Sequence, residues 1–183
     1  FNIMYKLYFV VILVLWFRLD SVQRGYSVEL TQNDISNAIE IHNKARIEVG
    51  LNIIEWSDDL SNEAQKWANN LALKDKIYHS SNDSRFNQGE NLYYSFSSQI
   101  GKPIFSKSPA KDASLAWYNE INDYKYSVYG SKLNESVMIG HYTQMVWKST
   151  TKVGIALARS SEGKEYIVAR YSPPGNFMGE YPY

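Results

Sequence analysis

The chain has 183 residues, which suits one domain preceded by a targeting segment. Its 19 basic and 19 acidic residues cancel and no block of like charges occurs, which excludes a nucleic-acid-binding stripe and a polybasic membrane patch. It has no cysteine, so disulfides, thiolate metal sites and catalytic thiols are excluded, and the apolar core alone must stabilise the fold.

The first 25 residues are predicted to be a secretory signal peptide. Lys6 precedes an apolar run over 7–17, and a polar stretch leads to Gly25. This basic, apolar and polar order is typical of signal peptides. The run is shorter than the roughly 20 apolar residues of a membrane-spanning helix, so no transmembrane span is expected. An uncleaved anchor or a buried helix is the alternative. We therefore expect a secreted, extracellular protein whose mature domain spans 26–183.

Two helices are predicted early in the mature chain. Apolar residues recur at helical spacing after Thr31, a residue type favoured at helix starts, and Gly50 can end the helix. A short apolar segment, Ile53–Trp56, follows. A second helix is predicted after Ser57 or Asp58. Its inner face consists of Leu60, Ala64, Trp67, Ala68 and Leu71.

In the middle of the chain, one further long helix is predicted between two irregular regions. Residues 74–87 break the pattern, and 89–96 form either a strand or a short helix, since periodicity does not decide. Ser108 followed by Pro109 starts a helix that runs to Ile121, because proline suits a first helical turn. An aromatic loop fills the following residues as far as Ile139.

The end of the chain is predicted to hold a short helix over 141–147 and two strands over 153–158 and 166–171. Residues 160–164 between the strands are typical of a hairpin turn, and 172–176 end the regular structure. Helices come first and an antiparallel pair comes last. This order favours an α+β layered domain over a doubly wound parallel sheet.

Several motifs resemble those of the CAP superfamily, which includes cysteine-rich secretory, venom-allergen and plant pathogenesis-related proteins. Residues 140–150 are similar to its first signature. Residues 167–176, IVARYSPPGN, are similar to its second, with Ala169 where the family usually has cysteine. His42–Arg46 resembles its first-helix motif and Gly89–Leu92 its central motif. Without cysteine, the chain is most similar to the Golgi-associated, disulfide-free branch, and the predicted signal peptide departs from that intracellular branch.

The resemblance implies a three-layer α-β-α sandwich with a central antiparallel sheet. It also implies a central cavity lined by two histidines and two glutamates. These fall on His79, Glu90, Glu120 and His141. His42 matches the first-helix motif and is expected to be a packed helix residue outside the cavity.

Such a set of side chains suggests a metal site. Neutral imidazoles bind Zn²⁺, and carboxylates can ligate the metal or orient a histidine. We therefore expect His79 and His141 to ligate a divalent metal, with zinc as the candidate cofactor. Bound zinc activates water, so a metal-dependent hydrolase with Glu90 or Glu120 as general base is an alternative. No nucleophile–base pair is evident, and a buried polar network is the further alternative.

The aromatic loop is the second candidate site, because Tyr124, Tyr126 and Tyr129 lie in one short stretch. The resemblance links this loop to a caveolin-binding-like segment and to sterol binding. A tyrosine offers a flat apolar face and a hydroxyl, which suits a sterol. The loop departs from the family pattern at Val128, where proline is usual, and by an extension over 131–137. Surface packing of these tyrosines is the alternative.

Together these features predict a secreted CAP protein that binds lipid or sterol. Two alternatives remain open at this stage. One is the metal-dependent hydrolase, and the other is an interaction module that binds a protein receptor.

We predict cleavage of the signal peptide between about Leu19 and Tyr26, because the polar exit follows the apolar run there. Amino-terminal sequencing of the protein secreted by expressing cells measures this directly. A secreted product that still begins at Met4 would contradict the prediction.

Overall fold

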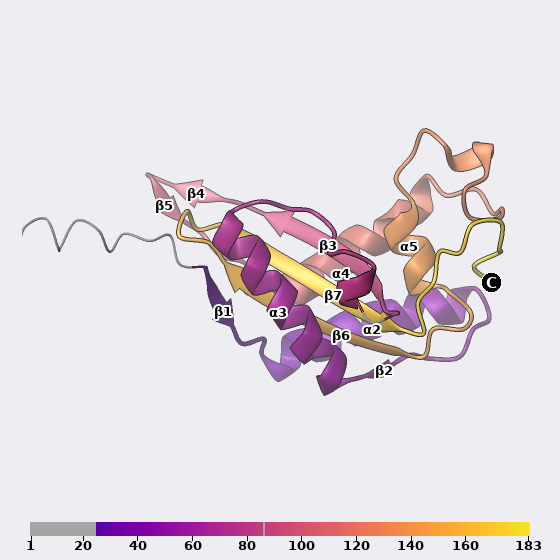
Figure 1. The fold of residues 1–183 in the computed structure, drawn as a ribbon, viewed down its shortest axis with the longest axis horizontal. Coiled ribbons are helices and arrows are strands. Elements are labelled where there is room, and N and C mark those ends of the chain that lie inside the picture. The colour runs from indigo at the N-terminus through magenta and orange to yellow at the C-terminus, as the bar shows by residue number, and fades with distance from the viewer. Residues whose placement is uncertain (1–24, 86) are drawn as a thin grey trace, which may run out of the picture.

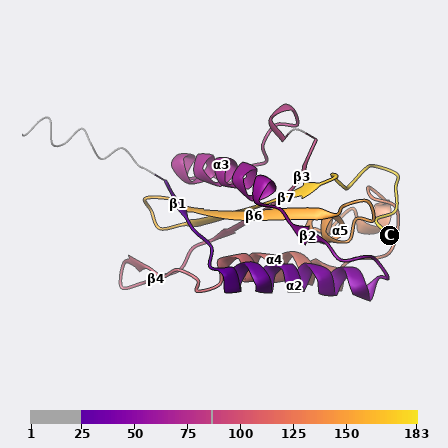
Figure 2. The same ribbon diagram turned by 90° about the horizontal axis from the view of Figure 1, so that it is seen from below.

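The computed structural model describes residues 25–85 and 87–183, so the predicted signal peptide, apart from Gly25, lies outside the described residues. A central sheet separates two helical layers (Figures 1 and 2). Helix α3 (Asp58–Lys74) covers one face of the sheet, while α2 (Gln32–Glu48) and α4 (Pro109–Asn119) cover the other. The α+β three-layer sandwich is thereby confirmed.

Four strands form the body of the sheet in the order β1-β6-β7-β3, with antiparallel neighbours throughout. Their bounds are β1 Tyr26–Val28, β6 Lys152–Arg159, β7 Glu165–Ser172 and β3 Gly89–Ser95. Strand β2 (Glu55–Trp56) pairs in parallel with the start of β6. A separate ribbon of β4 (Ser98–Gln99) and β5 (Lys102–Pro103) projects from one end of the molecule (Figure 1).

The remaining elements are short and lie close to the candidate site. Helix α5 spans Gly140–Met145, and the 3-10 turns are η1 (Asp83–Arg85), η2 (Glu120–Asn122) and η3 (Lys132–Asn134). The ambiguous segment 89–96 is resolved as strand β3. Within the described residues, no helix is both long enough and apolar enough to cross a membrane.

The helices begin after the predicted capping residues, and helix α4 is also capped by a side chain from α2. Thr31 and Ser57 each accept a hydrogen bond from a first-turn backbone N–H through the side-chain oxygen. Helix α4 begins at Pro109, as predicted, but the carboxylate of Asp34 caps it. That buried carboxylate accepts bonds of 3.0 and 2.9 Å from the N–H groups of Ala110 and Lys111. Asp34 therefore ties the start of α2 to the start of α4.

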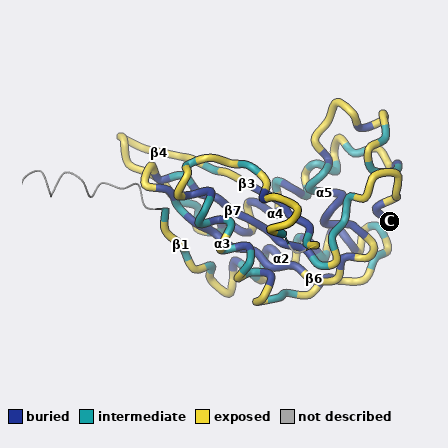
Figure 3. The backbone as a smooth tube through the Cα atoms, viewed as in Figure 1, coloured by how far each residue is buried: buried dark blue, intermediate teal, exposed yellow. Residues whose placement is uncertain are grey.

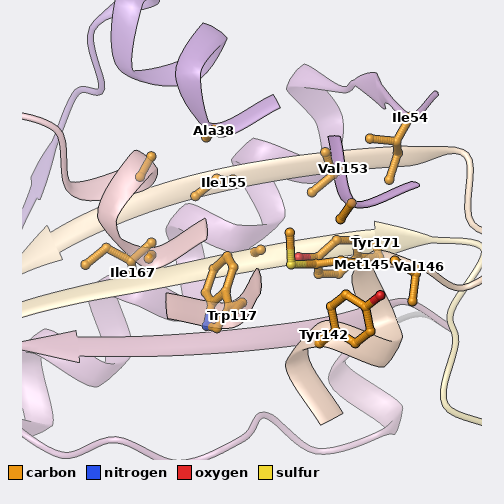
Figure 4. Close-up of a cluster of buried hydrophobic side chains, with 14 of the residues drawn as sticks. Ala38, Ile54, Trp117, Tyr142, Met145, Val146, Val153, Ile155, Ile167 and Tyr171 are labelled. Atoms are coloured by element: carbon orange, nitrogen blue, oxygen red, sulfur yellow. The ribbon is translucent and has the colours of Figure 1, made fainter. Parts of the chain in front are cut away.

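The core forms on both faces of the sheet, because β6 and β7 are buried along nearly their whole length (Figure 3). Successive side chains point to opposite faces. Ile155 and Ile167 pack towards α2 and α4 with Trp117 (Figure 4), whereas Ala156 and Val168 pack against α3.

Helix α3 approaches the sheet most closely at Gly154. A Cβ atom built there would lie 2.1 Å from the Ser61 nitrogen, so only glycine fits at this position.

His42 is fully buried in the core layer between the sheet and helices α2 and α4. Its Nδ1 lies 2.8 Å from the Ala38 carbonyl oxygen and its Nε2 lies 2.9 Å from the Tyr171 hydroxyl. Burial lowers the pKa of His42 to about 4, against the opposing effect of the Ala38 hydrogen bond, and the nearby charge of Arg46 lowers it further. The histidine is therefore a neutral core residue, as expected from the sequence.

We predict that His42 makes stability depend on pH between about 4 and 6.5. In that window the unfolded chain protonates this histidine and the folded chain does not, so stability falls as pH falls. The contribution is about 3 kcal/mol at most. Urea unfolding at several pH values should show a flatter profile for His42→Gln than for the wild type. Equal slopes for the two proteins would contradict the assignment.

Candidate functional site

An open cavity of about 1210 Å³ lies beside the start of β3. Three segments wall it: residues 82–85 with 87–91, residues 129–141 and residues 174–178. His79 and His141 both line it, His79 from the loop before η1 and His141 from helix α5. The predicted pair of histidines thus faces one cavity.

The first histidine is paired with a buried carboxylate. His79 Nδ1 lies 2.6 Å from Glu90 Oε1. The Glu90 side chain is 0% exposed, whereas the His79 side chain is 56% exposed. The imidazole therefore lies on the solvent side of the pair and the carboxylate on the protein side.

Glu90 is the centre of a larger polar network. Ser80 donates to it twice, from its backbone N–H at 3.0 Å and its hydroxyl at 2.7 Å. Arg170 approaches Glu90 Oε2 at 3.1 Å. Burial alone would raise the pKa of Glu90, but the hydrogen bonds from His79 and Ser80 and the charge of Arg170 lower it. Glu90 is therefore a carboxylate anion that fixes its partners.

Strand register explains why Glu90 meets Arg170. The two residues are partners across β3 and β7, and both point to the face covered by α3. The Ser80 hydroxyl donates to this carboxylate. It is thereby committed to a structural bond and does not form a Ser80–His79 nucleophile–base pair.

The second histidine repeats the arrangement on the opposite face of the sheet. His141 Nδ1 lies 2.6 Å from Glu120 Oε1. The other Glu120 oxygen accepts the backbone N–H groups of His141 and Tyr142 at 2.9 and 3.0 Å. The Trp117 ring stacks on the His141 ring with centroids 6.1 Å apart. One carboxylate therefore both caps the short helix α5 and orients the imidazole that α5 carries.

Asn91 connects the two faces at the edge of the sheet. It follows Glu90 in β3 and so points the other way. Its amide donates to the His141 carbonyl at 3.0 Å and to the Tyr171 hydroxyl at 3.1 Å. Since Tyr171 also bonds His42, a continuous set of buried bonds joins the core to the cavity wall.

The cavity wall beyond β7 is anchored on α5. Gln144 Oε1 accepts the Gly175 N–H at 2.9 Å, and the Asn176 amide donates to the Gly140 carbonyl at 2.8 Å. A Cβ atom on Gly89 would lie 2.1 Å from Gln144 Oε1, so Gln144 requires glycine at the start of β3. The two signatures, over 140–150 and 167–176, and the central motif Gly89–Leu92 therefore meet in space.

The two histidine–glutamate pairs determine which ring nitrogens face a ligand. A carboxylate only accepts hydrogen bonds, so each Nδ1 carries the proton. In the neutral imidazole the lone pair then lies on Nε2. This is the arrangement by which a carboxylate orients a metal-binding histidine. Across residues 25–85 and 87–183, no group of three or more His, Asp or Glu side chains is arranged to hold a metal ion. What each of the two pairs offers to a metal ion is one imidazole nitrogen, with a carboxylate behind the ring.

Three of the four predicted cavity residues, His79, Glu90 and His141, line the cavity directly. Glu120 lies behind His141 and is not among the described residues that line the cavity. The geometry makes both glutamates partners of the imidazoles.

The three tyrosines of the aromatic loop do not share one surface. Tyr129 lines the cavity, and burial, aided by the charge of Glu120, raises its pKa. Tyr124 packs on Tyr142 with ring centroids 5.4 Å apart. Tyr126 stacks on Tyr181 at 5.1 Å, outside the cavity, and remains 55% exposed.

Sequence reasoning missed two groups of site residues. Ser80 and Arg170 hold Glu90, and a cross-strand pairing signal could have indicated Arg170 once β3 and β7 were known to be neighbours. An apolar group at the cavity rim was also missed. It consists of Val137, Met138, Phe177 and Met178.

The model of the cysteine-rich secretory protein family, CAP, matches residues 39–171. The chain therefore belongs to the CAP family. It is 33% identical over 145 residues to human Golgi-associated plant pathogenesis-related protein 1, covering 79% of this chain and 86% of that protein. Pathogenesis-related leaf protein 4 of Solanum lycopersicum is also 33% identical, over 155 residues, covering 83% and 85% of the two chains.

Two solved structures share the fold. Na-ASP-1 superposes with a TM-score of 0.72 at 26% identity, covering 85% of this chain, and this chain spans 42% of Na-ASP-1. NaASP2, solved with Zn²⁺, superposes with a TM-score of 0.69 at 25% identity, covering 84% and 86% of the two chains.

We predict that Glu90→Gln destabilises the protein by about 3–5 kcal/mol, because it leaves the buried Arg170 guanidinium without its counter-charge. The same carboxylate-to-amide change at exposed Glu55 should alter stability by less than about 0.5 kcal/mol. Chemical denaturation of both variants measures the difference. Equal stability of the two variants would mean that the Glu90 network contributes nothing to folding.

Proposed function

We propose that this protein is an extracellular CAP protein whose open cavity binds a divalent metal ion, with Zn²⁺ as the candidate, and contacts lipid or sterol. The observation that carries the metal proposal is the matched pair of bonds from Glu90 and Glu120 to the Nδ1 atoms of the two histidines. Both bonds direct Nε2 away from the carboxylate, and both imidazoles line the same cavity.

The chemistry of this donor set favours a weak, open site. Structural zinc sites use four protein ligands and catalytic sites three. Two imidazoles leave the remaining positions to water or to an oxygen atom of a ligand. The solved structure of NaASP2 with Zn²⁺, which covers 84% of this chain, supports a metal in this fold. When bound, the metal would supply a positive charge and Lewis acidity in the cavity.

Extracellular action is supported by the predicted signal peptide, whose basic, apolar and polar order is typical of secreted proteins. The absence of cysteine does not oppose secretion, because two core layers on either side of the sheet stabilise the fold.

Lipid or sterol contact is the second part of the proposal. Tyr129 presents its ring to the cavity, while Tyr126 and Tyr181 form a stacked, half-exposed aromatic pair outside it. Two aromatic surfaces are therefore available to an apolar ligand. The cavity offers more space than the exposed Tyr126–Tyr181 pair, and it also adjoins the proposed metal.

The geometry favours binding over hydrolysis. A general base needs a carboxylate that can accept a proton from water. Glu90 and Glu120 each already accept three hydrogen bonds from histidine and backbone or hydroxyl donors. Both carboxylates are therefore engaged in holding the imidazoles.

We predict that replacing either His79 or His141 with alanine weakens zinc binding nearly as much as replacing both, because one imidazole is a poor zinc site. Glu120→Gln should weaken it by about 10–100-fold through loss of orientation. Calorimetric zinc titration measures each affinity, and circular dichroism checks folding.

Lys132→Ala is the matched control, since Lys132 lines the cavity without belonging to either histidine pair. It should leave zinc affinity unchanged. If the wild type and the double histidine variant bind zinc equally, the proposed site is wrong and the four residues form only a polar network.

A further inference from the structure

The chain contains two Asn-x-Ser sequons, the acceptor sequence for N-linked glycans. They span Asn82–Ser84, NDS, and Asn134–Ser136, NES. Each has an acidic residue in the middle and serine at the third position, so the sequence gives no reason to prefer one over the other. The structure places the two asparagines in different surroundings.

The side-chain amide of Asn134 is buried and is used by the fold. The residue is 8% exposed. Its Nδ2 donates to the Lys125 carbonyl at 2.7 Å and to the Ser127 hydroxyl at 2.9 Å. Its Oδ1 accepts the Lys125 N–H at 2.9 Å. Asn134 therefore ties the extension over 131–137 to the aromatic loop before it.

A glycan on Asn134 is incompatible with this loop. The sugar is linked to Nδ2 and replaces one of its two hydrogens, so one of the two donated bonds is lost. The linking nitrogen of a bulky glycan must also face solvent, whereas Asn134 is enclosed. Glycans are transferred to the chain before it folds. A chain that receives one at Asn134 therefore cannot close the loop and does not reach the folded, secreted state.

Asn82 has the opposite surroundings. It is exposed and directly precedes the turn η1, and Ser84 within that turn is exposed as well. The Oδ1 atom of Asn82 accepts a bond from the Arg85 guanidinium. Among the described residues, none accepts a bond from its Nδ2. A sugar on this nitrogen thus displaces no bond that the described part of the chain makes.

We propose that Asn82 carries an N-linked glycan and that Asn134 does not. This inference rests on the proposed extracellular function, because glycans of this kind are added in the secretory pathway, and it adds a modification site to that proposal. Asn82 is among the residues that line the open cavity, so the glycan would extend from the cavity wall. It would shield the turn η1 and leave the extension over 131–137 bare.

The test is peptide mass mapping of the full chain secreted by eukaryotic cells. Peptide N-glycosidase in heavy-oxygen water converts each glycosylated asparagine to a labelled aspartate and leaves the other asparagines unlabelled. We expect the label at Asn82 in most secreted molecules and no label at Asn134. On a gel, the same enzyme should produce a single downward shift.

Three variants assign the shift to one sequon. Asn82→Gln and Ser84→Ala should each abolish it, and the second keeps the asparagine, so a folding defect of the first cannot explain the result. Ser136→Ala is the matched control. It makes the same serine change in the other sequon, at an exposed position, and keeps every bond of Asn134. It should leave the gel shift and the secreted yield unchanged.

The outcomes distinguish this inference from the proposed function. If the protein is secreted with Asn82 unlabelled, or with a label at Asn134, the glycosylation inference is wrong and the extracellular proposal stands. If the full chain stays in the cytosol of the expressing cells without a glycan, the extracellular proposal is wrong, and the glycosylation of Asn82 is wrong with it.

Discussion

Each histidine of the cavity depends on one carboxylate that the fold removes from water. Glu90 and Glu120 cost free energy to desolvate, and hydrogen bonds from the surrounding protein offset this cost. The remaining bond from each goes to an imidazole Nδ1. A carboxylate held this firmly cannot move with its histidine, so the rings are oriented before any ligand arrives. Such preorganisation supports the proposal that the two imidazoles bind a metal, which usually takes three or four protein ligands.

The same carboxylates tie the site to the rest of the molecule. Glu90 pairs with Arg170 on the face of the sheet that α3 covers, and Glu120 caps the helix that carries His141. Between them Asn91 bonds both α5 and Tyr171, and Tyr171 reaches His42 in the core. A change at any of these buried groups therefore alters stability and ring orientation together. For this reason the stability of each site variant must be measured beside its affinity.

Much of this arrangement could be predicted from the sequence, and the rest required coordinates. Helical periodicity located α2 and α3, the Ser108–Pro109 start signal located α4, and the family resemblance singled out the four residues of the two histidine–glutamate pairs. Strands β1 and β2 were not predicted as strands, because two or three residues carry no periodicity. Arg170 and Ser80 were missed because their roles follow from strand register and loop path. The three tyrosines were grouped because they are close in sequence, yet the loop turns them into different environments.

The cavity can remain open without disulfides because buried core side chains support its walls. Trp147 is buried, yet it supports Phe177 at the rim. Gln144 holds Gly175 on one side and leaves no room for a side chain at position 89 on the other. The extension over 131–137, which departs from the family pattern, supplies several of the residues that line the cavity. Ligand choice should therefore follow this extension and the methionines beside it. The two histidine–glutamate pairs would fix how the polar end of a ligand is held, and the exposed apolar side chains of the cavity lining would decide which apolar body can accompany it.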